Sequence, residues 1–206
     1  MGDRRWHDTR VVFDPGTVRR DAIVRAATRL FGRYGYRKTS VDLIAREAEV
    51  AKPTVYAHFE DKDAVFVAVC GHVVDQIYAA ALAARDTPDV VDRLAGILAA
   101  KFTAIFELVD SSPHALELLE SQAVRAKEIV DAAEIRYAAL LRAAVKAAAS
   151  ASELAAVGVS AAELVHLLLL AGHGASYGAI TPAQHRANLD ALVAALLHRR
   201  PRRAGR

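Results

Sequence analysis

Apolar residues recur at intervals of three and four through most of this sequence, which places them along one face of an α-helix. Alanine, the residue with the highest helix propensity, occupies 44 of the 206 positions, whereas proline occupies only 6 and glycine 11. Few residues therefore interrupt the helical pattern. An apolar fraction of 53% is ample for a packed core, so we expect an all-α protein.

The composition also bears on where the chain works. Its single cysteine, Cys70, cannot form an internal disulfide, and residues 1–16 lack the apolar stretch of a secretory signal. Residues 164–185 carry no formal charge, but histidine, glycine, serine and proline break this run well below the roughly 20 apolar residues that cross a bilayer. We expect a cytoplasmic protein in which this run forms a buried helix.

Charge is distributed unevenly along the chain. Residues 1–62 have a formal net charge of +4, residues 63–196 of −6, and residues 197–206 of +5. A basic N-terminal segment joined to an acidic body suggests that one end contacts a polyanion, with nucleic acid as the leading candidate. Ordinary solvated surface is the alternative that charge alone leaves open.

Three helices are predicted near the N-terminus. A stripe of apolar residues at helical spacing covers residues 18–34, and Gly35 ends it. Short helices follow over residues 41–48 and 52–59, the second with Pro53 in its first turn, where a missing N–H costs nothing. Two short helices joined by a tight turn behind a longer helix form a helix-turn-helix arrangement, whose last helix can enter the major groove of DNA.

A more specific pattern lies in residues 30–69, LFGRYGYRKTSVDLIAREAEVAKPTVYAHFEDKDAVFVAV. It contains, in order, an aromatic-Gly pair, Thr-Ser, Ile-Ala, a turn, Lys-Pro-Thr-Val-Tyr, His-Phe and Lys. This order resembles the tetracycline-repressor (TetR) family of bacterial regulators, although the sequence adds little to the resemblance beyond about residue 75. The resemblance implies a homodimer whose third helices enter successive major grooves, while an all-helical body binds a small ligand and dimerises.

The resemblance also assigns residues to DNA. Lysine side chains can neutralise phosphates, hydroxyl and ring N–H groups can donate to phosphate oxygens, and Thr54 and Pro53 can present apolar surface to a thymine methyl. Packing remains the alternative for Tyr56, capping or packing for His58, and a purely helix-starting position for Lys62. The DNA-facing positions of the family fall here on Ser40, Val41, Lys52, Pro53, Thr54, Tyr56, His58 and Lys62.

This sequence departs from the family pattern at three positions. Glu49 stands in the turn where the family usually has glycine, so we expect a positive φ and a negative charge near DNA. Ala51 replaces a frequent serine cap, and Ala57 leaves Tyr56 without an aromatic neighbour. Non-specific attraction from further basic residues could compensate. These are Arg37, Lys38, and the arm residues Arg4, Arg5, Arg10, Arg19 and Arg20.

The rest of the chain is predicted to be a helical body with an apolar ligand pocket and a dimer seam. Its first expected helices cover residues 61–85 and run from the cap Thr87, followed by Pro88, to 109. A helical stretch over 114–149 follows, and the sequence does not decide whether it breaks near Ser121. The last two helices run from Ser160, which forms a capping box with Glu163, to 178 and from Thr181–Pro182 to 199. The pocket candidates, each of which could instead be core or surface, are Cys70, Tyr78, Phe102, Phe106, His114, Glu117 and Tyr137. The seam candidates are Leu164, Leu168, Ala171, Ala175, Leu192 and Leu196, unless both last helices simply complete the monomer core.

Catalysis is not expected. The sequence contains no nucleophile elbow, P-loop or glycine-rich dinucleotide motif, and His166 and His173 have no third ligand at metal-binding spacing. We therefore expect no cofactor and no metal, but a ligand-responsive DNA-binding regulator: a repressor that binds a palindromic operator as a homodimer and is released by a small, apolar effector. A helical adaptor that binds only protein is the alternative. The predicted organisation is a flexible arm over 1–17, a DNA-binding domain over 18–62, a ligand-binding and dimerisation domain over 63–199 and a basic tail over 200–206.

Overall fold

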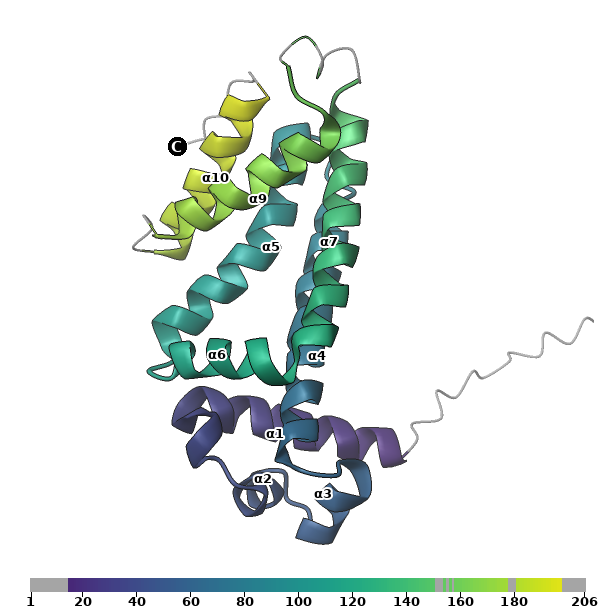
Figure 1. The fold of residues 1–206 in the computed structure, drawn as a ribbon, viewed down its shortest axis with the longest axis vertical. Helices are drawn as coiled ribbons and strands as arrows, with labels where there is room; N and C mark the ends of the chain where they lie inside the picture. Colours follow the sequence, from purple (N-terminus) through teal and green to yellow (C-terminus); the bar gives the residue numbers. More distant parts are fainter. Residues whose placement is uncertain (1–14, 151–153, 155, 157, 178–180, 198–206) are drawn as a thin grey trace, which may run out of the picture.

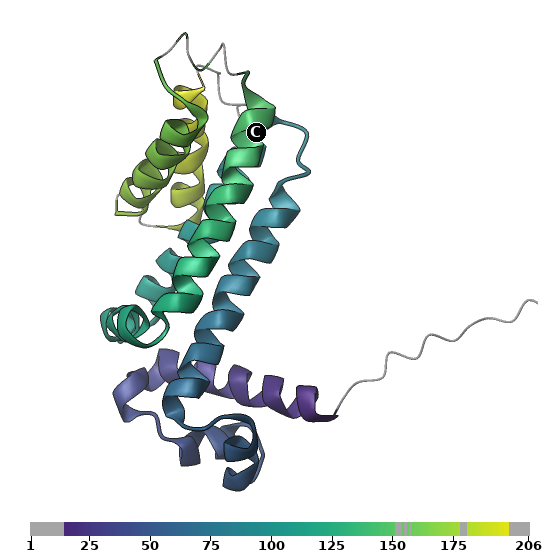
Figure 2. The same cartoon turned by 45° about the vertical axis from the view of Figure 1, so that its right-hand side comes forward.

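The computed structural model describes residues 15–150, 154, 156, 158–177 and 181–197 (Figures 1 and 2). The expected all-α fold is confirmed, since the described residues form helices and no strand. The helices are α1 Pro15–Lys38, α2 Val41–Glu47, α3 Lys52–His58, α4 Lys62–Ala84, α5 Val90–Ser111, α6 Ala115–Arg125, α7 Lys127–Ala148, α9 Ala161–Tyr177 and α10 Pro182–Leu196.

Helix α1 begins and ends differently from the expectation. It starts at Pro15, inside the stretch 1–17 that we expected to be a flexible arm, and residues 1–14 lie outside the described part. Gly35 interrupts the helical geometry with a φ of 80°, as the sequence predicts, and a short helical end follows to Lys38. The positive φ favours glycine here, and a Cβ would also lie 2.5 Å from a carboxylate oxygen of Glu117, so that this side chain would have to move.

The starts of the body helices follow capping chemistry, with one correction. Asp89, rather than Thr87, caps α5: its carboxylate accepts hydrogen bonds from the N–H groups of Val91 and Asp92 at 2.8 and 3.1 Å. Aspartate is as good a cap as any residue, and this one lies nearer the first helical residue, so Pro88 falls outside the helix. The predicted capping box at the start of α9 and the cap at the start of α10 are confirmed. The helical stretch that follows α5 is divided into α6 and α7 at Ala126, five residues after Ser121.

The helices form a small unit and a longer body (Figure 1). Helices α1 to α3 make the small unit at one end, and α4 leads out of it to run beside α7 and α5 (Figure 2). Helix α6 lies across the end of the body that faces α1, and α9 and α10 pair with each other and with α5. Of the described helices, only α4 is long and apolar enough to cross a membrane by length and composition, and here it packs against α1, α5 and α7.

Two apolar clusters hold these elements. The body cluster is built around Leu94, Leu98, Leu141 and Leu189, all fully buried. The cluster of the small unit contains Phe31, Ile44, Ala45, Val55 and Phe59, and it continues into the first half of α4 and to Leu118 of α6. The small unit therefore shares its core with α4 and α6, and the predicted domain boundary at residue 62 stays a prediction.

Part of the predicted dimer seam is wrong. Leu164 and Leu168 are 3% and 0% exposed within a single chain, where they belong to the body cluster and cannot reach a partner. The α9 face that carries them is covered by α5 and α7, because helical periodicity identifies an apolar face without identifying what covers it. The remaining candidates, Ala171, Ala175, Leu192 and Leu196, are half-buried and stay predictions.

Candidate functional site

The turn between α2 and α3 closes with a Schellman motif. The N–H of Val50 donates to the carbonyl of Ala45 at 3.0 Å, and the N–H of Glu49 donates to the carbonyl of Arg46 at 3.1 Å. Glu49 lies at the left-handed position of this motif with a φ of 56°, which confirms the expectation of a positive φ. It is the one non-glycine residue in the described part with a positive φ.

Helices α2 and α3 begin in different ways. The Ser40 hydroxyl accepts a hydrogen bond from the N–H of Leu43 at 3.2 Å and so caps α2. Ala51 gives α3 no side-chain cap, as expected, and Pro53 lies in the first turn. The buried Thr39 hydroxyl donates to the Gly35 carbonyl at 2.8 Å, which ties the end of α1 to the start of α2.

The residues predicted to face DNA lie largely at the surface. Lys52, Pro53 and Tyr56 are exposed, Tyr56 to 48%. The Lys52 ammonium lies 2.9 Å from a carboxylate oxygen of Asp42, and this hydrogen bond and charge raise the pKa of Lys52. The others are Ser40, also exposed, and Val41, Thr54, His58 and Lys62, which are half-buried.

Lys62 differs from the others because it has partners inside the molecule. Its ammonium donates to the Tyr36 carbonyl at 3.1 Å and lies 4.2 Å from the centre of the Tyr36 ring. Burial, and then the charge of Arg125, lower the pKa of Lys62. An ammonium has three donors, so these contacts do not by themselves prevent one with a phosphate.

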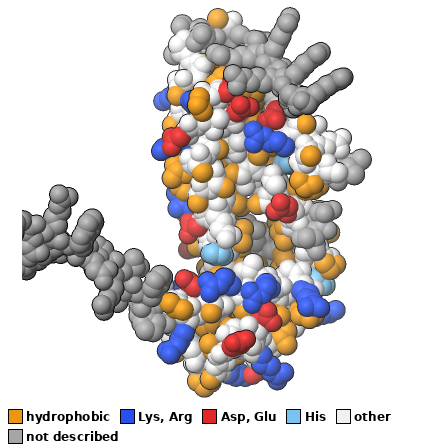
Figure 3. Space-filling model, turned by 180° about the vertical axis from the view of Figure 1, so that it is seen from behind, with side chains coloured by type: hydrophobic (Ala, Val, Ile, Leu, Met, Phe, Trp, Pro, Cys, Tyr) orange, Lys and Arg blue, Asp and Glu red, His pale blue; other side chains and the backbone are white. Residues whose placement is uncertain are grey.

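Basic side chains gather at the end of the molecule formed by α1 to α3. Seen from behind, Lys and Arg side chains form a band over the lower part of the surface (Figure 3). Arg37 and Lys38 are exposed at the end of α1, and the Arg20 guanidinium lies over the Phe59 ring at 5.2 Å. Arg4, Arg5 and Arg10 lie outside the described residues.

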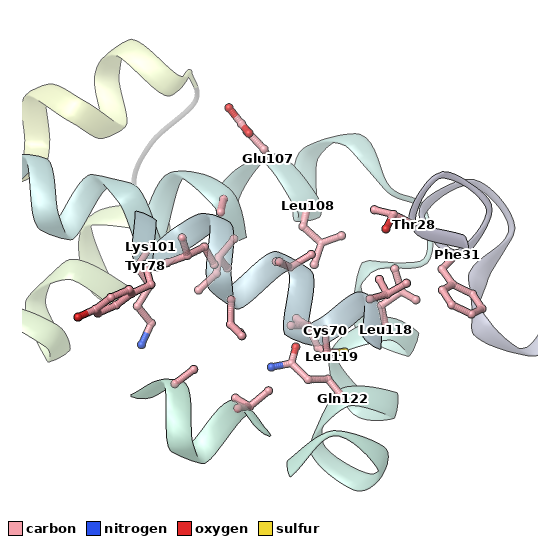
Figure 4. A pocket seen from close by; sticks show the side chains of 18 of the residues that line it. Thr28, Phe31, Cys70, Tyr78, Lys101, Glu107, Leu108, Leu118, Leu119 and Gln122 are labelled. Carbon is pink, nitrogen blue, oxygen red and sulfur yellow. The ribbon is translucent and has the colours of Figure 1, made fainter. Parts of the chain in front are cut away.

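A cavity of about 400 Å³ opens in the body between α4, α5, α6 and α7 and reaches α1 (Figure 4). Tyr78 and Lys101 lie at one end of it and Thr28 and Phe31 at the other. Its walls are mainly aliphatic and aromatic. The residues between the two ends include Val69, Cys70, Val73, Ile77, Ile105, Leu108, Leu118, Leu119, Gln122 and Val130.

Three of the predicted pocket residues line this cavity and four do not. Cys70, Tyr78 and Tyr137 line it. Burial raises the pKa of the Cys70 thiol to about 11, which keeps it protonated, and also raises the pKa of Tyr137, whose hydroxyl donates to the Ile97 carbonyl at 2.6 Å. Phe102 instead packs on His173 of α9 with ring centres 4.8 Å apart, and Phe106 stacks on His185 of α10.

The other two, His114 and Glu117, lie at the junction of α6 with α1. The Glu117 carboxylate accepts a hydrogen bond from the Arg37 N–H at 2.7 Å, and the His114 ring lies beside it at 3.8 Å. These two side chains therefore lie at the end of α1 and not in the cavity, and the Glu117 carboxylate takes the place of water as the acceptor of the Arg37 N–H.

Comparison with known proteins agrees with this arrangement. Residues 23–69 match the model of the bacterial regulatory proteins of the tetR family. The chain is 43% identical over 67 residues to the HTH-type transcriptional regulator HbdR of Aromatoleum sp. (strain CIB), covering 32% of this chain and 29% of HbdR. It is 35% identical over 92 residues to the HTH-type transcriptional activator FasR of Mycolicibacterium smegmatis, covering 44% of this chain and 42% of FasR.

Residues 23–69 are therefore of the TetR type. This chain shares its N-terminal region with proteins named as transcriptional regulators. It spans less than half the length of either curated relative. Its fold matches a TetR-family regulator of Streptomyces coelicolor with a TM-score of 0.66 at 19% identity, over 88% of this chain and 95% of that one.

Helix α6 joins the TetR-type DNA-binding unit to the body at both of its ends. Just before it, the Ser112 hydroxyl donates to the Gly32 carbonyl at 2.7 Å. At its end, the Arg125 guanidinium lies 3.2 Å from Asp63 and 4.4 Å from the centre of the Tyr36 ring. Between these ends α6 contributes Leu118 and other residues to the cavity wall, so it contacts both the cavity and the DNA-binding unit.

Sequence reasoning missed the charged pair of the cavity, Lys101 and Glu134. The Lys101 ammonium lies 2.6 and 2.7 Å from the two carboxylate oxygens of Glu134. One signal could have found the lysine: it falls within the apolar stripe of α5, between Leu98 and Ile105, where a charge needs a partner. Nothing in the sequence points to its partner on α7.

Replacing Glu49 tests whether the turn is strained. We expect the Glu49→Gly variant to be more stable than the Glu49→Ala variant, with a free energy of unfolding about 1 kcal/mol higher. The reason is that only glycine adopts the left-handed conformation without strain. Both variants remove the charge, so the comparison isolates the backbone. Urea denaturation of the two variants measures the difference, and equal stabilities would show that φ at this position carries no strain.

Proposed function

We propose that this chain is a DNA-binding transcriptional regulator, a repressor that binds a palindromic operator as a homodimer, and that a small, largely apolar effector in the cavity releases it. One observation supports the response to a ligand: α1 of the DNA-binding unit contributes Thr28, Phe31 and Gly32 to the cavity wall. An effector bound there touches the DNA-binding unit directly. Because its DNA target defines where such a regulator acts, we propose that it is cytoplasmic.

We propose that α3 enters the major groove. The exposed positions of its first turn and the start of α2 support this assignment, since the N-terminal residues of a recognition helix contact base edges. In this arrangement Lys52 neutralises a phosphate, while Thr54 and Pro53 contact bases. The proposed contact residues are Ser40, Val41, Lys52, Pro53, Thr54, Tyr56 and His58, with Lys62 as a further phosphate contact.

We propose that two chains associate through the outward face of α9. Leu167 and Leu170 are 41% and 56% exposed, and the neighbouring Gly174 has open space where a Cβ would stand. Large exposed leucines on a face bordered by an open glycine are suited to close helix packing. A twofold dimer presents two identical α3 helices, which is why the operator is expected to be a palindrome or near-palindrome.

Release by an effector requires that the effector prefer one conformation of the protein. Helices α4 and α6 contact both the cavity and the DNA-binding unit, so a change in their position would alter the separation of the two α3 helices. Binding energy on DNA would then be lost because both half-sites could no longer be engaged at once. We assign a repressor because a protein that blocks a promoter needs only to bind DNA, whereas an activator also needs a surface that contacts the transcription machinery. FasR, by contrast, is named as an activator.

Substitutions on α9 separate interface from core. We expect Leu170→Glu to leave the chain folded and to weaken the dimer by about 3 kcal/mol or more, roughly a hundredfold in Kd, because each subunit then buries an unpaired charge. Leu168→Glu is the matched core variant and should unfold the chain. Light scattering and circular dichroism report both effects. A folded Leu170→Glu dimer of unchanged affinity would contradict the proposed seam.

Removing Lys52 tests the DNA surface. On an operator selected from a random DNA pool, we expect Lys52→Ala to lower the slope of log affinity against log salt by about 0.9 per subunit, since one released counterion per phosphate contact is lost. Asp42→Asn is the control: it removes the partner of Lys52, keeps the lysine, and should bind at least as tightly with the same slope. A slope unchanged in Lys52→Ala, or selected sites without dyad symmetry, would contradict the proposal.

A further inference from the structure

The charged pair in the cavity wall is asymmetric. The side chain of Lys101 is 11% exposed, whereas that of Glu134 is 48% exposed. The lysine ammonium lies 5.4 Å from the centre of the Tyr137 ring and 5.8 Å from that of Phe102, so two ring faces and a carboxylate surround it. Lys101 is fixed in the wall, and Glu134 stands on the side open to water.

This asymmetry decides which partner a ligand can replace. A cationic ligand that paired with Glu134 would have to break the ion pair between Glu134 and Lys101. The largely buried ammonium of Lys101 would then have no counterion, which is costly. An anionic ligand would instead replace Glu134 as the partner of Lys101. The displaced Glu134 carboxylate can rotate towards the solvent because it is already half exposed. The exchange keeps one negative group on the buried cation.

The rest of the cavity sets the chemistry of the ligand's other end. Between Lys101 and Phe31 the lining is mainly aliphatic, and the thiol of Cys70 is uncharged at neutral pH. The one further carboxylate of the described lining, Glu107, is exposed and points away from the labelled residues that surround the cavity (Figure 4). Tyr137 has its hydroxyl engaged with the Ile97 carbonyl and offers mainly ring surface.

We propose that the effector is an amphipathic monoanion, such as a carboxylate on an extended apolar chain, whose negative group replaces Glu134 on Lys101. This inference rests on the proposed role of the cavity as the effector site. The apolar chain then runs from Lys101 along α4 and α5 towards Phe31 and Thr28, so that its far end meets α1. The charge holds one end of the ligand, and the length of the chain determines whether the DNA-binding unit is contacted.

Three probes with the same chain and different head groups test the proposal on the full-length protein. Titration calorimetry with dodecanoate, dodecanol and dodecyltrimethylammonium, each below its micelle concentration or solubility limit, should give the tightest binding for dodecanoate, by about tenfold over dodecanol. Only the carboxylate brings a negative charge to the Lys101 ammonium. Dodecyltrimethylammonium should bind more weakly than dodecanol, since it must displace the buried lysine.

Variants identify the residue responsible. Lys101→Met should remove the preference for dodecanoate over dodecanol and leave dodecanol binding within about twofold, whereas Lys101→Arg should keep the preference. Glu134→Gln should strengthen dodecanoate binding by a few-fold, because the competing carboxylate is gone. Lys127→Met on the surface of α7 is the matched control and should change nothing.

The outcomes separate this inference from the function on which it rests. Equal binding of dodecanoate and dodecanol, or preference for the cation, would overturn the anionic effector while leaving the cavity as a ligand site. An unchanged preference in folded Lys101→Met would overturn the role of Lys101. Failure of all three probes to bind would overturn both the inference and the proposed effector site.

Discussion

Three aromatic rings fix the DNA-binding unit on the body. Phe31 of α1 meets Phe66 of α4 edge to face with ring centres 5.3 Å apart, and Tyr36 meets the same ring at 5.1 Å. Pairs in this geometry contribute roughly 0.5–1.5 kcal/mol each beyond the area they bury. Phe31 and Phe66 also line the cavity, so the packing that orients α1 on α4 is part of the wall that an effector would contact. A new occupant of the cavity would therefore act on the contacts that determine where α2 and α3 lie.

A second, polar set of contacts complements this apolar one. The Glu117 carboxylate accepts a hydrogen bond from the N–H of Arg37, two residues after Gly35. The Arg125 guanidinium pairs with Asp63 at the start of α4, and the Tyr36 hydroxyl donates to the same carboxylate. Hydrogen bonds are directional, so they fix the register of α6 on α1 where apolar packing alone would allow sliding. Because α6 lines the cavity between these contacts, an occupant that preferred one position of α6 would also affect the DNA-binding unit.

The sequence predicted well what depends on neighbouring residues. The helix-turn-helix arrangement, the end of regular helix at Gly35, and the positive φ of Glu49 all follow from local spacing and backbone sterics. Tertiary neighbours were not predictable in the same way. Periodicity marked Leu168 and Phe102 as apolar without showing that α5 and α9 cover each other, and it could not pair Lys101 with a glutamate on another helix. The DNA contacts and the domain boundary depend on partners and motions, and they stay predictions.

The proposed response to an effector requires that α6 hold the DNA-binding unit in place through the turn after Gly35. Amide hydrogen exchange of the wild type, Glu117→Ala and the control Glu120→Ala, which alters an exposed residue of the same helix, tests it most directly. In Glu117→Ala we expect exchange of the Arg37 amide to accelerate by about tenfold and the acceleration to extend into α2, because local opening of this turn releases the start of that helix. Glu120→Ala should match the wild type. Acceleration confined to Arg37, with α2 unchanged, would contradict this role of α6.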